Sequence, residues 1–439
     1  MFKMNKKIKG SKNLNVPNKG EQSQTCLGSA ERKEQSPQGN VPNKRAQSQV
    51  YLNYAEHEEH LHKENVPNLR FPEFSGEWES NELHKVASLS KGIGISKDQL
   101  SDLGHPCILY GELYTKYKSE IIREVYSKTQ LDVANLVKSH TNDVIIPCSG
   151  EAAIEIATAR CVLIPDVLLG GDLNIIRLNG RHDGGFFAYQ LNGKRKVDIA
   201  KVAQGVSVVH LYGEHLKKVK VAYPSLEEQQ KISSFLALLD ERIATQIKII
   251  EKLESLIRGL YERLFNIDGA AYIQLGNVAK IQKGQQINGE KLSEIGSYYV
   301  MNGGVVPSGY LEDFNTPANT ISISEGGNSC GYVQYNGVPF WSGGHCYTLI
   351  EPINSFNYKY LFHYLKFKEQ SIMALRIGSG LPNIQKKDLE HFPILNVSKK
   401  EQDKMACIFD DILDRIICER QIALKYEEQK KYLLSNLFI

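Results

Sequence analysis

The chain has 439 residues and a net charge of only +3, because 53 basic side chains nearly balance 50 acidic ones. This length predicts two or three domains, and the small net charge excludes a general polycation that coats nucleic acid or anionic membranes. The eight cysteines form no C-x-x-C pair and no run of about 18 apolar residues occurs, so we expect a cytoplasmic protein without a zinc site, disulfides or a membrane span.

The first 64 residues are rich in Asn, Lys, Gln, Ser and Glu and poor in large apolar side chains. The tetrapeptide Asn-Val-Pro-Asn begins at Asn15, Asn40 and Asn65, at a spacing of 25 residues. Such a segment cannot bury enough apolar surface to offset its chain entropy, so we predict a disordered, repeat-containing extension over 1–64. An inert extension is our interpretation, and a regulatory tail is the alternative.

Two segments, 65–224 and 266–397, show short β-like runs separated by Gly and Asp, which predicts mixed α/β modules. A helix is expected around Tyr358–Lys366. The predicted strands of both modules are Val144–Pro147, Cys161–Ile164, Leu173–Leu178, Val206–Leu211, Ile321–Ser324, Gly331–Tyr335 and Cys346–Ile350.

The second module repeats the start of the first. Leu83–Tyr110 aligns with Leu275–Asn302 without a gap at an offset of 192, and the identical pairs include Gly92/Gly284. The sequences between these starts and the module ends diverge, and there we expect the features that distinguish the two modules.

Each module is followed by a long amphipathic stretch, 225–265 and 398–439, and these two align at an offset of 173. Both open with S-x-x-E, at Ser225 and Ser398, which predicts capping boxes. Forty-one residues make a helix of roughly 60 Å, longer than a module of this size is wide. We therefore predict an antiparallel coiled coil with a pseudo-two-fold axis, and the alternative is two helices buried separately on their own modules.

Apolar side chains at steps of three and four mark the predicted seam, which could also dock partners. The expected residues are Ile232, Leu236, Leu239, Ile243, Ile247, Ile250 and Leu260 in the first helix and Ile408, Ile412, Ile416, Leu433 and Leu437 in the second.

This order of motifs resembles the specificity subunits of type I restriction–modification systems. The resemblance covers about 65–439, although the N-terminal triplication departs from the family pattern. Its motifs are Pro67–Phe74 followed by Trp78, the phrase Leu83–Gly92 with its copy Leu275–Gly284, the junction Tyr223–Ile232, and Ser398–Met405.

The resemblance implies two target-recognition domains at 65–224 and 266–397, a central conserved helix at 225–265 and a distal conserved helix at 398–439. It also implies a non-catalytic subunit that binds double-stranded DNA at a bipartite, asymmetric target with a fixed spacer. Two modification subunits would bring S-adenosylmethionine and methylate adenine at N6, and restriction subunits would use ATP and Mg²⁺. No cofactor is expected in this chain itself, which has neither a G-x-x-x-x-G-K-[ST] loop nor an N-P-P-[YF] tetrapeptide.

Candidate DNA contacts come from turns and basic loops. Gly170-Gly171-Asp172 matches Gly343-Gly344-His345 at the 173 offset, and an aspartate can accept from a cytosine amino group. An ordinary turn explains the glycine pairs equally simply. Solvated loops without a ligand are the alternative for the other basic and polar candidates. The predicted contact residues are Asp172, Arg177, Arg181, His182, Lys194, Arg195, Lys196, His345, Ser379, Asn383, Gln385, Lys386 and Lys387.

Two other functions remain open. A coiled-coil adaptor would use the modules to bind protein, and a silent, recombining specificity cassette would fold without partners. A self-contained enzyme fits least well.

Overall fold

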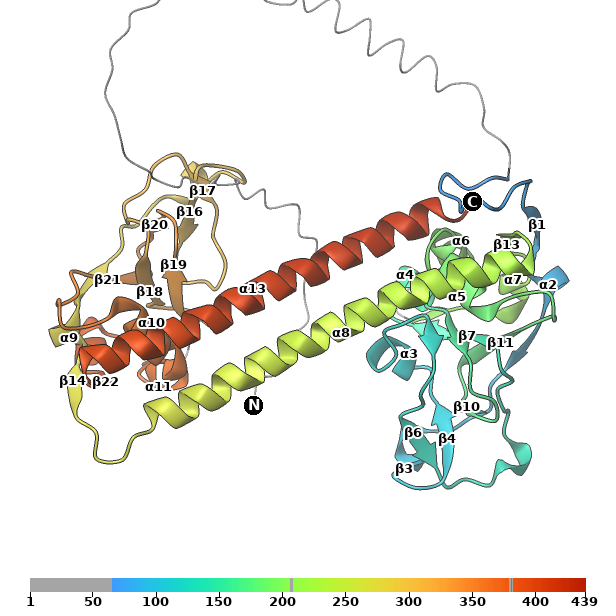
Figure 1. Cartoon of the computed structure of the whole chain (residues 1–439), viewed down its shortest axis with the longest axis horizontal. Coiled ribbons are helices and arrows are strands. Elements are labelled where there is room, and N and C mark those ends of the chain that lie inside the picture. Colours follow the sequence, from blue (N-terminus) through green and yellow to red (C-terminus); the bar gives the residue numbers. More distant parts are fainter. Residues whose placement is uncertain (1–64, 206–207, 379, 381) are drawn as a thin grey trace, which may run out of the picture. The chain divides into compact units, whose positions relative to one another are not determined.

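A computed structural model describes residues 65–205, 208–378, 380 and 382–439. It has the predicted α/β architecture, with two modules and a long helix after each (Figure 1). The predicted disordered extension over 1–64 lies outside the described residues. Within these residues, none of the helices combines the length and apolarity that crossing a bilayer requires.

The first module is built on a five-stranded sheet in the order β2-β11-β7-β9-β5, with a four-stranded sheet β10-β4-β6-β3 beside it. Two further strand pairs, β1–β13 and β8–β12, complete the module. Its strands are β1 (Glu79–Glu82), β2 (Ala87–Lys91), β3 (Leu100–Ser101), β4 (His105–Ile108), β5 (Ile121–Ile122), β6 (Ser127–Thr129), β7 (Asp143–Pro147), β8 (Ser149–Gly150), β9 (Arg160–Val162), β10 (Leu168–Leu169), β11 (Leu173–Leu178), β12 (Val209–His210) and β13 (Lys220–Tyr223). Its helices are α2 (Leu83–Val86), α3 (Glu112–Thr115), α4 (Ala153–Ile156), α5 (Gly184–Asn192), α6 (Lys196–Val202) and α7 (Gly213–Leu216).

The second module repeats this plan with fewer strands. Its sheets run β15-β21-β18-β19 and β17-β16-β20, and β14 pairs with β22. The strands are β14 (Tyr272–Gln274), β15 (Lys280–Lys283), β16 (Tyr298–Met301), β17 (Tyr310–Leu311), β18 (Thr320–Ser324), β19 (Val333–Asn336), β20 (Trp341–Ser342), β21 (Cys346–Ile350) and β22 (Pro393–Leu395). The helices are α9 (Leu275–Val278), α10 (Tyr358–Phe367), α11 (Glu369–Met373) and α12 (Lys386–Glu390).

The two long helices are α8 (Leu226–Phe265) and α13 (Lys399–Asn436). The predicted capping box is complete only at α13, where Ser398 accepts from the Glu401 amide and the Glu401 carboxylate accepts from the Ser398 amide. At α8 the reciprocal bond is missing, so that half of the prediction is wrong. The Glu228 carboxylate instead binds the Arg70 guanidinium through two bonds of 2.8 and 2.7 Å, because a buried carboxylate gains more from a bidentate cation than from an amide.

The helices pair antiparallel, as Figure 1 shows, and the pairing has a pseudo-two-fold axis. At its centre the Gln246 amide donates to the carboxylate and to the backbone oxygen of Glu419, a residue 173 positions further along. A residue meets its own repeat partner only where a two-fold axis passes between them. The contact therefore places the axis at Gln246 and Glu419.

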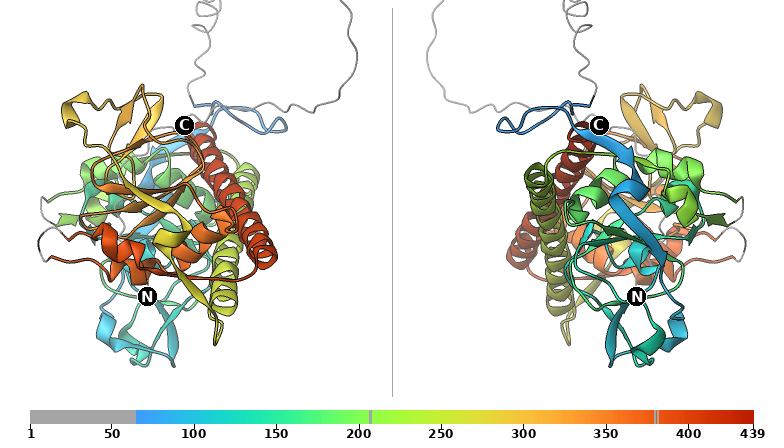
Figure 2. Two further views of the ribbon diagram at one scale, coloured as in Figure 1. Left: turned by 90° about the vertical axis from the view of Figure 1, so that its left-hand side faces the viewer. Right: turned by 90° about the vertical axis from the view of Figure 1, so that its right-hand side faces the viewer.

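Each module packs on both helices, so the chain returns to its first module at its end. Ile232 and Leu236 of α8 share one core with Leu433 of α13, with the α13 C-cap Leu437 and with the first module. Tyr261 and Phe265 of α8 share the other core with Phe409 of α13 and with the second module. In the end views of Figure 2 the helix pair lies along one side of the sheets.

Matched glutamines tie each module to its following helix. The Gln229 side chain accepts from the Asp183 amide at 3.0 Å, and the Gln402 side chain accepts from the Asn357 amide at 2.7 Å. Asp183 and Asn357 are the N-caps of α5 and α10. The two glutamines lie 173 positions apart and the two N-caps 174 apart, and this repeated contact explains why both modules bind the helix pair in the same way.

Two predicted seam residues lie outside the seam. Ile247 is 41% exposed and Ile408 is 45% exposed, whereas their neighbours Gln246 and Phe409 are buried. Adjacent residues on a helix point about 100° apart, so only one of each neighbouring pair can face the partner helix. The other predicted positions are buried or half-buried.

The junctions of the helix pair with the two modules differ in chemistry. At the first module the Lys430 ammonium lies 2.5 Å from carboxylate oxygens of both Glu120 and Asp240. Burial alone would lower the pKa of Lys430, but the two carboxylates outweigh it and the net shift is upward. At the second module the repeat positions hold Ile257 and Leu413, which belong to the apolar core.

A neutral histidine joins the second module to the helix pair. His363 is fully buried on α10, where it contacts the Tyr261 hydroxyl through Nδ1 at 2.9 Å and Asp410 through Nε2 at 2.9 Å. Burial lowers the pKa of His363, although Asp410 opposes the shift. A neutral ring with its proton on Nε2 satisfies both contacts and joins α8, α10 and α13.

Candidate nucleic-acid interface

A close crossing of two backbone segments supports the same surface on each module. Gly92, just after β2, packs against Gly170, and Gly284, just after β15, packs against Gly343. A Cβ atom on Gly92 would lie 2.0 Å from the Gly170 oxygen, and one on Gly284 would lie 2.2 Å from the Gly343 oxygen. Glycine therefore recurs at positions 92 and 284, because a side chain there would collide with the backbone of the Gly-Gly turn.

We expect Gly92→Ala to destabilise the protein by about 1–3 kcal/mol, because the methyl group would push two backbone segments apart. The midpoint of urea unfolding measures this change. Gly94→Ala is the matched control, since a Cβ atom there would meet no atom within 4 Å. Equal midpoints for the two variants would contradict this account of the crossing.

A hairpin next to the crossing recurs at the 173 offset. Gln204 and His210 form a backbone bridge in the first module, and Ile377 and Asn383 form the same bridge in the second. His210 also pairs with Ser149, as Asn383 pairs with Gly326. Residues 206–207, 379 and 381 fall between these bridged residues in the sequence and lie outside the described residues.

Four polar residues surround the crossing in the first module, and we call Lys91, Ser149, Asp172 and His210 the first turn cluster. Asp172 is exposed and has a left-handed backbone (φ 59°), which aspartate tolerates better than most residues. Its carboxylate accepts from the Ser149 hydroxyl at 3.2 Å. The exposed carboxylate keeps further acceptor sites, so this cluster can receive hydrogen bonds from a ligand.

Lys91 completes the cluster on its other side. Its ammonium lies 6.0 Å from the centre of the Tyr212 ring, and that ring lies 6.1 Å from His210. Beneath them, burial raises the pKa of the Cys148 thiol to about 11, so the thiol stays protonated and unreactive at neutral pH. The first cluster is thus suited to polar contacts and not to thiol chemistry.

The second turn cluster consists of Lys283, Glu325, His345 and Asn383. The buried Glu325 carboxylate accepts from Lys283 at 2.5 Å and from the Tyr347 hydroxyl at 3.2 Å. Its other oxygen lies 3.5 Å from Nδ1 of the exposed His345. Glu325 and Cys148 occupy equivalent places, since their amides donate to the His345 and Asp172 carbonyls respectively. The two clusters therefore share a backbone and differ in charge.

The structure brings three of the predicted contact residues into these clusters, namely Asp172, His345 and Asn383. Gln385, Lys386 and Lys387 are exposed directly after the second hairpin, where Gln385 is the N-cap of α12. Ser379 lies outside the described residues. The exposed Arg181 stands apart from both clusters, in the turn before α5.

Two of the predicted contact residues make internal contacts instead. Arg177 binds the buried Asp143 carboxylate through bonds of 2.9 and 2.7 Å. His182 is buried with its ring 4.6 Å from that of Tyr223, and burial lowers its pKa. Both side chains hold the first module together, so they are not free to contact a base.

The basic loop Lys194–Lys196 lies against the end of α13. Arg195 donates to the Ile439 carbonyl at 2.9 Å and pairs with Asp198. Lys194 is exposed and Lys196 is half-buried, and both line a hollow beside α13. This loop therefore joins the module to the returning helix.

Sequence reasoning missed His210, Lys91, Lys283 and Glu325. The 173 offset contains the signal for His210, because it places Gly205 opposite Gly378 and His210 opposite Asn383. Both glycines have positive φ, 123° and 94°, as the repeated hairpin requires. Glu325 carried no signal, because its structural counterpart Cys148 has different chemistry and lies 177 positions away, outside the 173 offset.

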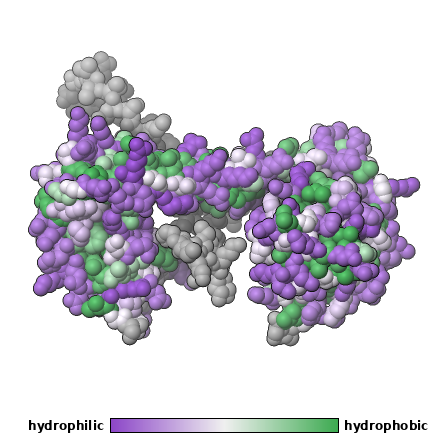
Figure 3. All heavy atoms as spheres, turned by 90° about the horizontal axis from the view of Figure 1, so that it is seen from below, coloured by the Kyte–Doolittle hydropathy of each residue, from purple (hydrophilic) through white to green (hydrophobic). Residues whose placement is uncertain are grey.

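The described residues contain no group of three or more His, Cys, Asp or Glu side chains that could hold a metal ion. In the space-filling view of Figure 3 the face seen is largely hydrophilic over both modules, with scattered apolar residues. A polar ligand suits such a surface better than an apolar one.

Comparison with known proteins decides the family. The model of the type I restriction modification DNA specificity domain matches residues 76–255 and again 268–427. This chain belongs to the type I restriction–modification specificity subunits. The two matches cover both modules and most of both long helices.

Individual relatives agree with this family. A predicted type I specificity subunit of Mycoplasma pneumoniae is 37% identical over 122 residues, and one of Mycoplasma genitalium is 32% identical over 163 residues. These alignments cover 27% and 36% of this chain, and only 32% and 42% of the two relatives.

The crystal structure of a type I S subunit from M. genitalium has the same fold. It superposes with a TM-score of 0.65 at 19% identity, covering 85% of this chain and 99% of that one. At this identity the likeness extends to the fold alone.

Proposed function

We propose that this specificity subunit recognises DNA for a type I restriction–modification complex, with each turn cluster reading one half of a bipartite, asymmetric target. The observation that carries the proposal is the pair of clusters with one backbone and different side chains. A pseudo-two-fold protein suits the local two-fold symmetry of duplex DNA. Different side chains at equivalent places make the two half-sites differ.

The chemistry of each cluster fits contacts in the major groove. Asp172 can only accept when ionised, which suits the amino group of cytosine or adenine. Asn383 can both donate and accept, and Lys283 and His345 can donate to guanine. Among the other predicted contacts we retain Arg181, Lys194, Lys196, Ser379, Gln385, Lys386 and Lys387 as contacts to bases or phosphates. Arg177, His182 and Arg195 act as supports in this proposal.

The helix pair supplies spacing and docking in this proposal. Phe235 and Ile408 are repeat partners that are 38% and 45% exposed, and Ile249 and Ile422 are repeat partners that are each 36% exposed. Apolar residues exposed twice about one axis suit two copies of one partner. These would be the modification subunits, which hold S-adenosylmethionine, and restriction subunits with ATP and Mg²⁺ would join them. The chain itself performs no catalysis in this scheme.

Sequencing of N6-methyladenine in the host genome tests the proposal. Removing the gene should abolish methylation at one bipartite motif, and restoring it should bring the motif back. An adaptor or a silent cassette would leave the methylation pattern unchanged.

Asp172→Asn should relax or change one base of one half-site and leave the other half-site intact. The amide adds donors where the carboxylate only accepts, and a contact of this kind discriminates by about 1–3 kcal/mol. Complementation followed by methylation sequencing measures the change. Asp166→Asn is the matched control, because Asp166 is also exposed with a left-handed backbone (φ 60°) but lies outside the cluster. An unchanged motif with Asp172→Asn would remove Asp172 from the reading surface.

A further inference from the structure

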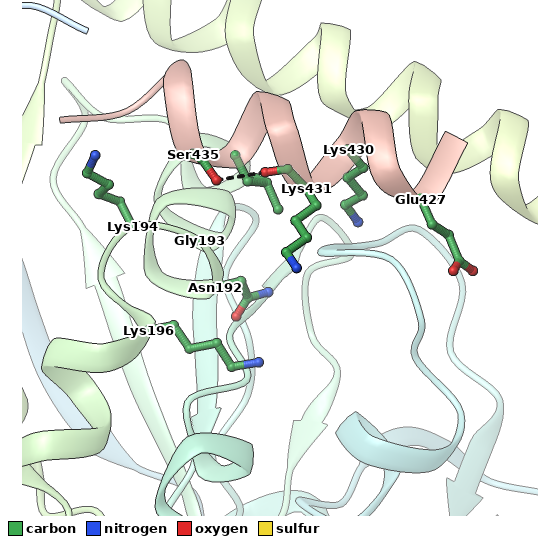
Figure 4. A pocket seen from close by; sticks show the side chains of 9 residues that line it. Asn192, Gly193, Lys194, Lys196, Glu427, Lys430, Lys431 and Ser435 are labelled. Carbon is green, nitrogen blue, oxygen red and sulfur yellow. Dashed lines mark hydrogen bonds between the residues drawn. The ribbon is translucent and has the colours of Figure 1, made fainter. Parts of the chain in front are cut away.

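A basic hollow lies between the first module and the C-terminal part of α13 (Figure 4). Its volume is about 640 Å³, and Asn192, Lys194, Lys196, Lys430, Lys431 and Ser435 line it. Figure 4 shows Lys196 and Lys431 pointing into the hollow on either side of Asn192, whereas Lys194 points away. Two ammonium groups from different elements thus face one space.

The charge of the hollow remains largely uncompensated. Lys430 is neutralised by Glu120 and Asp240, and Glu427 is the acidic residue that lines the hollow. Within the described part of the chain, Lys196 and Lys431 have no carboxylate within 4.0 Å. The Asn192 amide is fully used by Ala159 and Glu120, so the two lysines are the donors left for a ligand.

The hollow is held open by fixed contacts. Arg195 clamps the loop to the Ile439 carbonyl at 2.9 Å. Gly193 approaches α13 so closely that a Cβ atom there would lie 3.2 Å from Leu434. The backbones carrying Lys196 and Lys431 therefore keep a fixed relation, and a ligand need not order the loop before it binds.

A second hollow of about 740 Å³ reaches the first turn cluster. Lys196 lines both hollows, and the second is also lined by Ser149, Gly150 and Val208. Ser149 belongs to the cluster, and Val208 belongs to its hairpin. Lys196 therefore lies both beside the last turns of α13 and at a hollow that reaches the first turn cluster.

We propose that Lys196 and Lys431 bind phosphodiester oxygens of the DNA strand that passes the first turn cluster. This inference rests on the proposed function and extends it, because α13 becomes a DNA contact besides a spacer and docking helix. Lysine ammonium groups bind phosphate as point charges without reading sequence. The pair therefore contributes affinity at any sequence, while Asp172 selects the base.

The test compares the complex purified with wild-type chain against one carrying Lys196→Gln and Lys431→Gln. Binding to duplexes with and without the methylated motif is titrated between 50 and 200 mM salt. Both affinities should fall in parallel, and the slope of log affinity against log salt should decrease by about 1 for each lost phosphate contact. The methylated motif should stay the same.

Two controls separate charge from structure. Lys85→Gln with Lys220→Gln removes two exposed charges from the same module outside the hollow and should leave the slope unchanged. Lys196→Arg with Lys431→Arg keeps both charges and should restore the wild-type slope. Unfolding midpoints of all variants should agree.

Three outcomes would overturn the inference. If the glutamine variant has the wild-type slope of log affinity against log salt, Lys196 and Lys431 do not contact phosphate, and the proposed function is unaffected. If the glutamine variant binds DNA normally but loses a partner subunit from the complex, the hollow binds a carboxylate of that subunit instead of DNA phosphate. Absence of any preference for the motif in the wild-type complex would reject the proposed function, and this inference with it.

Discussion

Lengthening both long helices by the same seven residues should lengthen the spacer of the DNA target by about three base pairs. Seven residues add about 10.5 Å of helix and change its phase by about 20°, and a base pair occupies about 3.4 Å. The segments to duplicate are 243–249 in α8 and 416–422 in α13, because they face each other around the contact of Gln246 with Glu419. The antiparallel register is then preserved on both sides of the axis.

The measurement is the affinity of the purified complex for duplexes that carry the same half-sites at different spacings. The best duplex should have the longer spacer, with both half-sites unchanged. Duplicating 243–249 in α8 alone is the control, since it mismatches the helices and should abolish binding at every spacing. An unchanged optimum with both helices lengthened would show that the helix pair does not set the spacing.

Replacing Lys430 by methionine should destabilise the protein by about 3–5 kcal/mol. The change leaves Glu120 and Asp240 side by side without their cation, and breaking a buried ion pair from one side has a cost of this size. The Lys430 side chain is 16% exposed, so solvent screens the pair only weakly. The free energy of urea unfolding measures the loss.

The second module provides the design for a compensating variant. Lys430→Ile with Asp240→Leu copies Ile257 and Leu413, the apolar repeat partners. With Glu120→Gln added, neither carboxylate is left without its cation, and this triple variant should be much less destabilised than Lys430→Met. Lys425→Met is the surface control, because Lys425 is 78% exposed and its pair with Glu428 contributes about 0–1 kcal/mol. A loss of less than 1 kcal/mol for Lys430→Met would mean that the apolar contacts alone join α13 to the first module.

The architecture was predictable because helical periodicity is a local signal and the repeat appears when the chain is aligned with itself. Steps of three and four apolar residues predicted α8 and α13, and their matched length, greater than the width of a module, predicted their antiparallel pairing. The residues that form the seam were harder to predict, since the exposed Ile247 and Ile408 are as apolar as seam residues that are buried, such as Ile232 and Ile416. Which face of an apolar stripe is buried depends on the partner helix, and that information is not local.

The candidate interface was likewise predictable from the sequence only in part. The Gly-Gly turns located Asp172 and His345, because each turn lies against a glycine, Gly92 or Gly284, where a side chain would meet its backbone. Arg177 and His182 have the residue types of DNA contacts, but Asp143 and Tyr223, distant in the sequence, pack against them. A side chain's residue type does not reveal whether an internal partner already occupies it.

The sequence by itself determined that this chain has two related modules and two matched helices, because repetition and helical periodicity are properties of the chain. Only the tertiary structure decided which residues of that pattern face outward as two chemically different turn clusters. It also revealed that Lys196 and Lys431, 235 positions apart in the sequence, share one hollow. The physical reason is that a surface is formed by segments that meet through folding, and their meeting depends on the packing of the whole chain.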